Sequence, residues 1–214
     1  MLGIDVYFDP VCPWCYIGKA RLDRAIGKLS SGAVSLNWRP FLLNPDIPAA
    51  GVDRQTYLNW KFGSQDSAQA AYSHVVSAAE AEELEFNPER ISRTPCTLDA
   101  HRLLLWAAVE GLEVAELIDK MFLGYLCQGL DVSESSVLIS IAVECGMDKT
   151  LVQRLLDSEQ DKDVVLASSN DARSRGIDSI PSFIVNNSYT VHGAQPTEVW
   201  LSILGQELAG QQPG

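Results

Sequence analysis

Cys12 and Cys15 are separated by Pro13 and Trp14, and this spacing is typical of a redox-active dithiol. Thiol–disulfide exchange needs a reachable thiolate and a second thiol that lies close enough to resolve the mixed disulfide. A pair at the start of a helix meets both needs, because the sulfurs lie within one turn and the unpaired N–H groups there favour the thiolate of Cys12. Pro13 suits the first helical turn, where no N–H is required. We therefore expect Cys12 to be the catalytic nucleophile and Cys15 the resolving thiol.

A zinc site is the alternative chemistry for such a pair, and it usually needs four Cys or His ligands at recognisable spacing. The other candidate ligands are dispersed and include no second pair: Cys96, Cys127, Cys145, His74, His101 and His192. Redox chemistry is therefore favoured, and we expect no metal. Cys127 and Cys145 fall in helical patterns and are expected to be buried apolar residues, whereas the reactivity of Cys96 stays open.

The sequence around the pair predicts a strand, a helix and a second strand. Apolar residues alternate over residues 4–8, as in a strand with one buried face. Over residues 18–29 they recur with helical spacing, and the pattern ends at the Ser-Ser-Gly stop of residues 30–32. Alternation returns over residues 34–38 and ends at Pro40, which cannot donate to a sheet. The dithiol is thus expected where a strand passes into a helix of an α/β fold.

The middle of the chain has a different pattern. Residues 46–160 carry several helical patterns and no convincing strand. Two apolar stripes in this region, over residues 114–125 and 138–145, have the spacing of amphipathic helices. We therefore predict an all-helical insertion that is large enough to hold a small core of its own.

The pattern returns to strands after Gly176. A β-hairpin is predicted over residues 182–191, and an amphipathic helix is predicted to begin near Pro196. The two ends of the chain, residues 1–45 and 161–214, are therefore expected to form one discontinuous domain around the helical insertion.

The composition is that of an ordinary globular protein, with 46% hydrophobic and 21% charged residues among 214. A formal net charge of −12 argues against nucleic acid and anionic membranes as partners, because both would repel the protein. No apolar run approaches the roughly 20 residues that span a bilayer, and the chain does not open with a basic and apolar signal sequence. We therefore expect a cytoplasmic protein without a nucleic-acid or membrane partner.

Several segments carry a resemblance to a known family. The dithiol after the first strand, together with Ile180-Pro181 before the late hairpin, resembles the thioredoxin superfamily, in which a cis-proline faces the catalytic pair. The stretches Asp9–Lys19, Thr97–Leu103 and Val191–Pro196 are similar to the DsbA-like oxidoreductases of FrnE type. The resemblance implies a thioredoxin fold in which a large all-helical insertion separates an N-terminal βαβ unit from a C-terminal ββα unit.

The resemblance also implies roles at the site. Ile180 and a cis-Pro181 would lie beside Cys12 and offer backbone hydrogen bonds to an extended peptide or to glutathione. The two residues between the cysteines would support the dithiol. The helix of His101 would help to cover the site and bind substrate, although a satisfied buried polar residue is the plainer interpretation of this histidine. No tightly bound cofactor is implied, and glutathione is the candidate co-substrate.

The expected function is that of a protein disulfide oxidoreductase or isomerase, which passes through a mixed disulfide at Cys12 with a thiol- or disulfide-containing protein or small molecule. The alternative is a glutathione-dependent isomerase or transferase related to the 2-hydroxychromene-2-carboxylate isomerases and kappa-class glutathione transferases. Those enzymes generally carry a serine in place of Cys12 and lack Cys15, so the intact pair favours redox chemistry. A third hypothesis is a binding module whose thiols are incidental.

Overall fold

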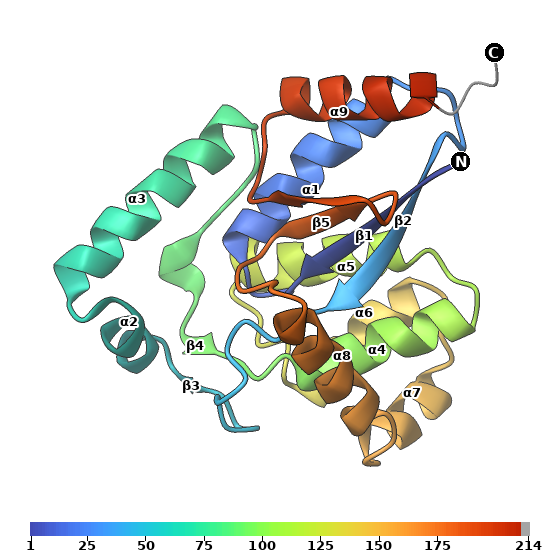
Figure 1. The fold of residues 1–214 in the computed structure, drawn as a ribbon. Helices are drawn as coiled ribbons and strands as arrows, with labels where there is room; N and C mark the ends of the chain where they lie inside the picture. The colour runs from blue at the N-terminus through green and yellow to red at the C-terminus, as the bar shows by residue number, and fades with distance from the viewer. Residues whose placement is uncertain (211–214) are drawn as a thin grey trace.

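The computed structural model describes residues 1–210 and is centred on a four-stranded sheet (Figure 1). The strand order is β2-β1-β5-β6, with the bounds β1 Leu2–Phe8, β2 Val34–Pro40, β5 Ser182–Val185 and β6 Tyr189–His192. β1 and β2 are parallel, whereas β5 is antiparallel to both of its neighbours. The predicted opening unit and the late hairpin are therefore confirmed, and they build the sheet of a thioredoxin fold.

Helices cover the sheet, and most of them lie between β2 and β5 in the sequence. In chain order they are α1 Pro13–Ile26, α2 Arg54–Phe62, α3 Gln65–Ala81, α4 Leu98–Val109, α5 Val114–Phe122, α6 Ser135–Glu144, α7 Lys149–Leu156, α8 Lys162–Ser174 and α9 Thr197–Gly210. A π-helical turn, Leu123–Cys127, extends α5, and a 3-10 turn spans Pro88–Arg90. The two predicted apolar stripes are confirmed as α5 and α6. In the described part of the chain, no helix is both long and apolar enough to cross a bilayer.

A two-stranded ribbon also lies in this region and was not predicted. β3 (Val52–Asp53) pairs antiparallel with β4 (Arg93–Thr94). Two residues are too few to show an alternating pattern, and the partner strand lies far away in the chain.

Successive side chains of β1 point to opposite faces of the sheet, and each face packs against helices. Ile4 is buried with Leu22 of α1 and Trp200 of α9, the two helices that lie on the same side of the sheet in Figure 1. Tyr7 belongs to a different buried cluster, which it shares with Ala172 of α8. The strand that leads to the dithiol is therefore packed on both of its faces.

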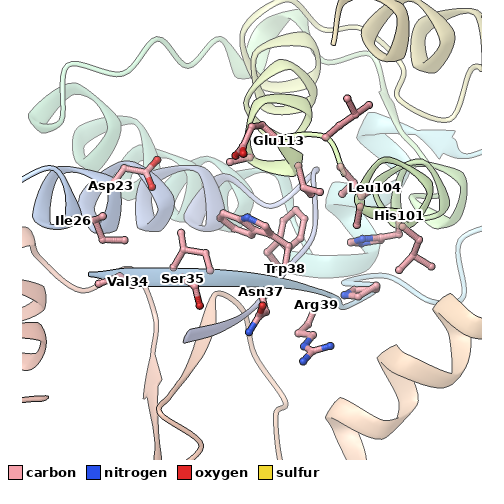
Figure 2. Close-up of a pocket in the computed structure, with 18 of the residues that line it drawn as sticks. Asp23, Ile26, Val34, Ser35, Asn37, Trp38, Arg39, His101, Leu104 and Glu113 are labelled. Carbon is pink, nitrogen blue, oxygen red and sulfur yellow. The ribbon is translucent and has the colours of Figure 1, made fainter. Parts of the chain in front are cut away.

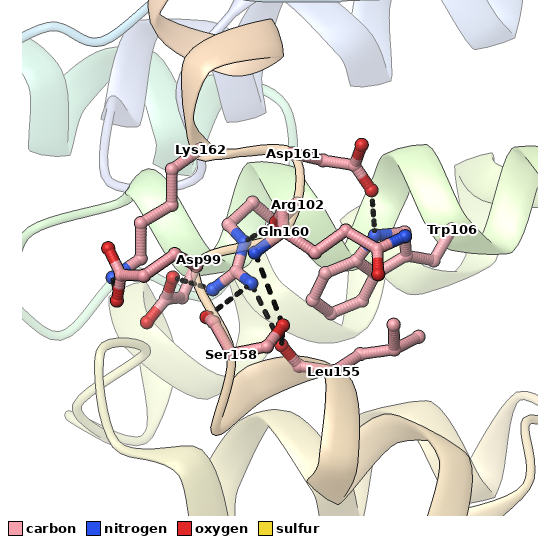
Figure 3. A network of polar contacts seen from close by, with 9 residues as sticks. Asp99, Arg102, Trp106, Leu155, Ser158, Gln160, Asp161 and Lys162 are labelled. Atoms are coloured by element: carbon pink, nitrogen blue, oxygen red, sulfur yellow. Dashed lines mark hydrogen bonds and ion pairs between the residues drawn. The ribbon is translucent and has the colours of Figure 1, made fainter.

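Arg102 of α4 holds the segment between α7 and α8 (Figure 3). Its guanidinium group is fully buried and donates hydrogen bonds to the carboxylate of Asp99 and to the carbonyl oxygens of Leu155, Ser158 and Gln160. Because the last carbonyl groups of a helix need partners, this network fixes the end of α7 against α4.

Candidate active site

The dithiol lies at the junction of β1 and α1. Cys12 is the N-cap residue of α1, with φ −89° and ψ 110°, and Pro13 occupies the first helical turn. The carbonyl oxygen of Cys12 accepts hydrogen bonds from the N–H groups of Cys15 at 3.0 Å and Tyr16 at 3.2 Å. The side chain of Cys12 is therefore placed at the N-terminal end of a 14-residue helix, where the helix dipole favours a negative charge.

Both thiols are almost completely covered. Cys12 is 4% exposed and Cys15 is 3% exposed, and neither forms a disulfide. Burial raises the pKa of Cys15 well above its ordinary value, and the adjacent Cys12 adds to this shift. Trp14, at 37% exposure, is the outward-facing side chain of the motif. A thiol that stays protonated is a poor nucleophile, because the thiolate is the reactive form.

The segment before β5 approaches the dithiol from the C-terminal half of the chain. The Sγ atom of Cys12 donates to the carbonyl oxygen of Ile180 at 3.9 Å, and the Ile180–Pro181 peptide bond is cis. Gly18 of α1 permits this approach, because a Cβ atom there would lie only 3.0 Å from Cγ of Pro181 and 3.5 Å from Ala194. The structure thus brings Cys12 and Ile180 together. Gly18 was not predicted as a site residue, although an isolated glycine inside a helical pattern is a signal of close packing.

Asp9 is a buried carboxylate beside the dithiol that was not predicted as a site residue. Its oxygens accept hydrogen bonds from the N–H of Val11 at 3.1 Å, the N–H of Leu43 at 2.7 Å and the hydroxyl of Thr97 at 3.0 Å. Burial raises the pKa of Asp9 to about 6, and these hydrogen bonds oppose the shift. The charge of Asp9 in turn contributes to the raised pKa of Cys15. Asp9 therefore fixes the loop that leads to Cys12 and influences the second thiol.

His101 lies elsewhere, in the wall of a cavity that we call the β2-edge cavity (Figure 2). The lining of this cavity includes residues 34–40, Ile26, His101, Leu104, Ala108, Glu113 and Val114. It includes neither Cys12 nor Cys15. The imidazole ring is fully buried and packs edge-on against Phe8, with 5.4 Å between the ring centroids. The ring of His101 thus contacts the end of β1, the strand that leads to the dithiol.

The three further cysteines lie in partly or fully buried positions, and Cys145, which was expected to be buried, is only half-buried. Cys127 donates from Sγ to the carbonyl oxygen of Glu85 at 2.9 Å, and burial raises its pKa. Cys96 is half-buried, and burial raises its pKa as well, which disfavours its thiolate. Within residues 1–210, no three His, Cys, Asp or Glu side chains converge in a way that could hold a metal ion.

The fold is that of a known family. Residues 3–205 match the family described as DSBA-like thioredoxin domain. Because the match covers nearly the whole chain, this protein belongs to that family.

Solved structures share the same fold. The probable DsbA oxidoreductase SCO1869 from Streptomyces coelicolor is 30% identical, with a TM-score of 0.88 over 100% of this chain and 92% of that protein. A 2-hydroxychromene-2-carboxylate isomerase is 12% identical, with a TM-score of 0.71 over 99% and 100% of the two chains. The cytosolic disulfide reductase DsbM from Pseudomonas aeruginosa, solved with GSH, is 17% identical, with a TM-score of 0.65 over 97% and 99%. The last two show the fold alone.

Proposed function

We propose that this protein is a thiol–disulfide oxidoreductase that works through a mixed disulfide at Cys12. One observation carries the proposal: Cys12 caps the N-terminus of α1 and its sulfur faces the carbonyl oxygen of Ile180, while Cys15 lies in the first turn of the same helix. Membership of the DSBA-like thioredoxin family supports the same class of chemistry.

In the reductive direction, the Cys12 thiolate attacks one sulfur of a substrate disulfide. The bond between Cys12 and that sulfur forms as the substrate S–S bond breaks, and the other sulfur leaves as a thiolate that takes up a proton. Cys15 then loses its proton and attacks Sγ of Cys12, which releases the second substrate thiol. The protein ends with a Cys12–Cys15 disulfide, and the substrate has gained two electrons and two protons. The oxidative direction reverses these steps.

The burial of Cys12 favours a small or flexible substrate. Only a narrow group reaches the sulfur of a residue that is 4% exposed, and the backbone at Ile180 offers hydrogen-bonding groups to an extended ligand beside it. Glutathione fits this description and is the proposed co-substrate, a proposal supported by the GSH in the DsbM structure. A cytosolic location, as described for DsbM, is proposed on the same ground.

We also propose a division of labour along the chain. Residues 1–45 and 161–214, of which 211–214 lie outside the described residues, would form the thioredoxin-like part that carries the dithiol and Pro181. Residues 46–160 would form an inserted part that supports it. The hydrogen bond from Thr97 to Asp9 supports the role given to the inserted part, because it joins that part to the loop before Cys12.

Equilibration in glutathione redox buffers, followed by thiol trapping and mass spectrometry, tests the proposal. We expect a reversible two-electron transition between a dithiol and a disulfide that is confined to Cys12 and Cys15. Cys12→Ser is expected to abolish the transition, whereas Cys145→Ser, which changes a half-buried cysteine at the end of α6, is expected to preserve it. The midpoint gives the reduction potential, and about 30 mV shifts the equilibrium tenfold for a two-electron couple.

Two other outcomes would contradict the proposal. Arrest of Cys12 at a glutathione adduct, without participation of Cys15, would favour the glutathione-dependent isomerase or transferase. The absence of any transition would favour a binding module.

A further inference from the structure

The β2-edge cavity has the size and the walls of a small-molecule site. Its volume is about 770 Å³, within the range of about 300 to 1,000 Å³ that is typical of ligand pockets. In Figure 2 the ring of Trp38 stands between β2 and the helices, where it packs against Phe8 with 5.1 Å between centroids. Asn37 and Arg39 point to the other side of the strand, where both donate to Asp5. The side chains that enter the cavity from β2 are therefore largely apolar.

His101 is the polar group in the inner wall of this cavity. Neither Nδ1 nor Nε2 has a hydrogen-bond partner among residues 1–210, although both atoms are buried. Burial lowers the pKa of His101 to about 3, so the ring is neutral and carries one donor and one acceptor nitrogen. An unpaired buried donor and acceptor are costly, and each calls for a partner that the protein itself does not supply.

The charges at the cavity are acidic. Asp23 and Glu113 lie along its rim (Figure 2). The nearby ammonium group of Lys19 is shared between Asp23 and Asp119, at 2.7 Å from each, so a net negative charge remains. This arrangement disfavours an anionic ligand, including glutathione with its two carboxylates.

We propose that the β2-edge cavity binds an uncharged, mostly apolar small molecule whose single hydroxyl group is hydrogen-bonded by His101. A hydroxyl group both donates and accepts, so it pairs with either ring nitrogen. The apolar remainder of the ligand packs against Trp38, Leu104 and Val114. The site is separate from the dithiol and takes a different class of ligand.

Fluorescence titration with N-phenyl-1-naphthylamine, a neutral apolar probe, tests the cavity. Two exposed neighbours on α4 provide a matched pair, because Ala108 lines the cavity and Val109, at 88% exposure, does not. We expect saturable binding at one site, at least about tenfold weaker binding by Ala108→Phe, and binding by Val109→Phe within about twofold of the unchanged protein. Glutathione is expected not to displace the probe. Failure to saturate, displacement by glutathione, or equal binding by Ala108→Phe would overturn the proposal.

Competition between two ligands of the same shape tests the role of His101. We expect 1-naphthol to displace the probe about three- to tenfold more effectively than 1-methylnaphthalene, which lacks the hydroxyl group. His101→Leu is expected to remove this preference and to leave the binding of 1-methylnaphthalene intact. A preference that persists in His101→Leu, or that is missing from the unchanged protein, would show that His101 does not hold the hydroxyl group. The Ala108 and Val109 variants test the cavity independently of whether His101→Leu folds.

Discussion

The dithiol end of the molecule contains the buried carboxylate of Asp9, the β2-edge cavity contains the buried imidazole of His101, and these two groups differ in their hydrogen-bond partners. Asp9 accepts hydrogen bonds from its own loop and from two distant segments, whereas His101 has no hydrogen-bond partner among the described residues. Burial favours the uncharged form of both, raising the pKa of Asp9 to about 6 and lowering that of His101 to about 3. In both groups, burial is the main cause of the shift toward the uncharged form. The difference in partners distinguishes a group that holds loops in place from a group that remains available to a ligand.

Of the changes considered, Cys15→Ser is expected to have the largest effect. It is expected to block turnover at the dithiol and to leave ligand binding at the β2-edge cavity unchanged. Without the resolving thiol, the mixed disulfide at Cys12 accumulates and turnover of a disulfide substrate falls by about 1,000-fold or more. Mass spectrometry of the trapped protein and a turnover assay measure both effects. Binding of N-phenyl-1-naphthylamine at the β2-edge cavity is expected to be unchanged. Turnover near that of the unchanged protein would show that Cys15 does not resolve the mixed disulfide.

Arg102→Met is expected to destabilise the helix that carries His101. The change leaves the carbonyl oxygens of Leu155, Ser158 and Gln160 without their charged donor, and urea unfolding is expected to show a loss of about 3 to 5 kcal/mol. Arg154→Met, at an exposed arginine of α7, is the control and is expected to change the free energy of unfolding by less than about 0.5 kcal/mol. Equal stability of the two variants would mean that the network in Figure 3 does not hold α7 against α4.

His101 and Asp9 are expected to change stability with pH in opposite directions. The pKa of His101 is about 3 in the folded protein and about 6.5 when unfolded, so the unfolded chain gains a proton first and stability is lost as pH falls from about 6.5. The pKa of Asp9 is about 6 in the folded protein and about 3.9 when unfolded. The folded protein therefore holds the Asp9 proton more tightly, and this group loses stability as pH rises from about 4 to 6.

Urea unfolding between pH 4 and pH 7 separates the two contributions. As pH falls from 7 to 4, the free energy of unfolding of His101→Leu is expected to rise by about 3 kcal/mol relative to that of the unchanged protein, because the acid-sensitive group is gone. Asp9→Asn is expected to show a relative change of similar size and opposite sign over the same range. His74→Leu, at an exposed histidine of α3, is the control. A profile for His101→Leu that parallels the unchanged protein would mean that His101 is not buried in the neutral form.

The two regions also differ in how far the sequence predicts them. Four residues and the alternation before them are enough to place the dithiol at a strand–helix junction, because both signals are local. The burial of Asp9 depends on Leu43 and Thr97, which come from distant parts of the chain. The cavity at His101 depends on how α4 lies against β2, and helical periodicity says which face is apolar without saying what that face meets. The placement of Ile180 beside Cys12 could be predicted only from the resemblance to a family.

Gly18→Ala is expected to give the smallest effect and tests how closely the dithiol end is packed. The new Cβ atom would lie 3.0 Å from Cγ of Pro181, so the segment carrying Ile180 must move by a few tenths of an ångström relative to Cys12. Overpacking of this kind costs about 1 kcal/mol, so we expect a small loss of stability. We also expect disulfide exchange to be roughly three- to tenfold slower. The β2-edge cavity does not include Gly18, and probe binding there is expected to be unchanged.

Gly205→Ala on α9, where nothing lies within 4 Å of the added atom, is the matched control and is expected to raise stability by about 0.5 to 1 kcal/mol. An exchange rate that Gly18→Ala leaves unchanged would mean that the separation of Cys12 and Ile180 does not limit the reaction.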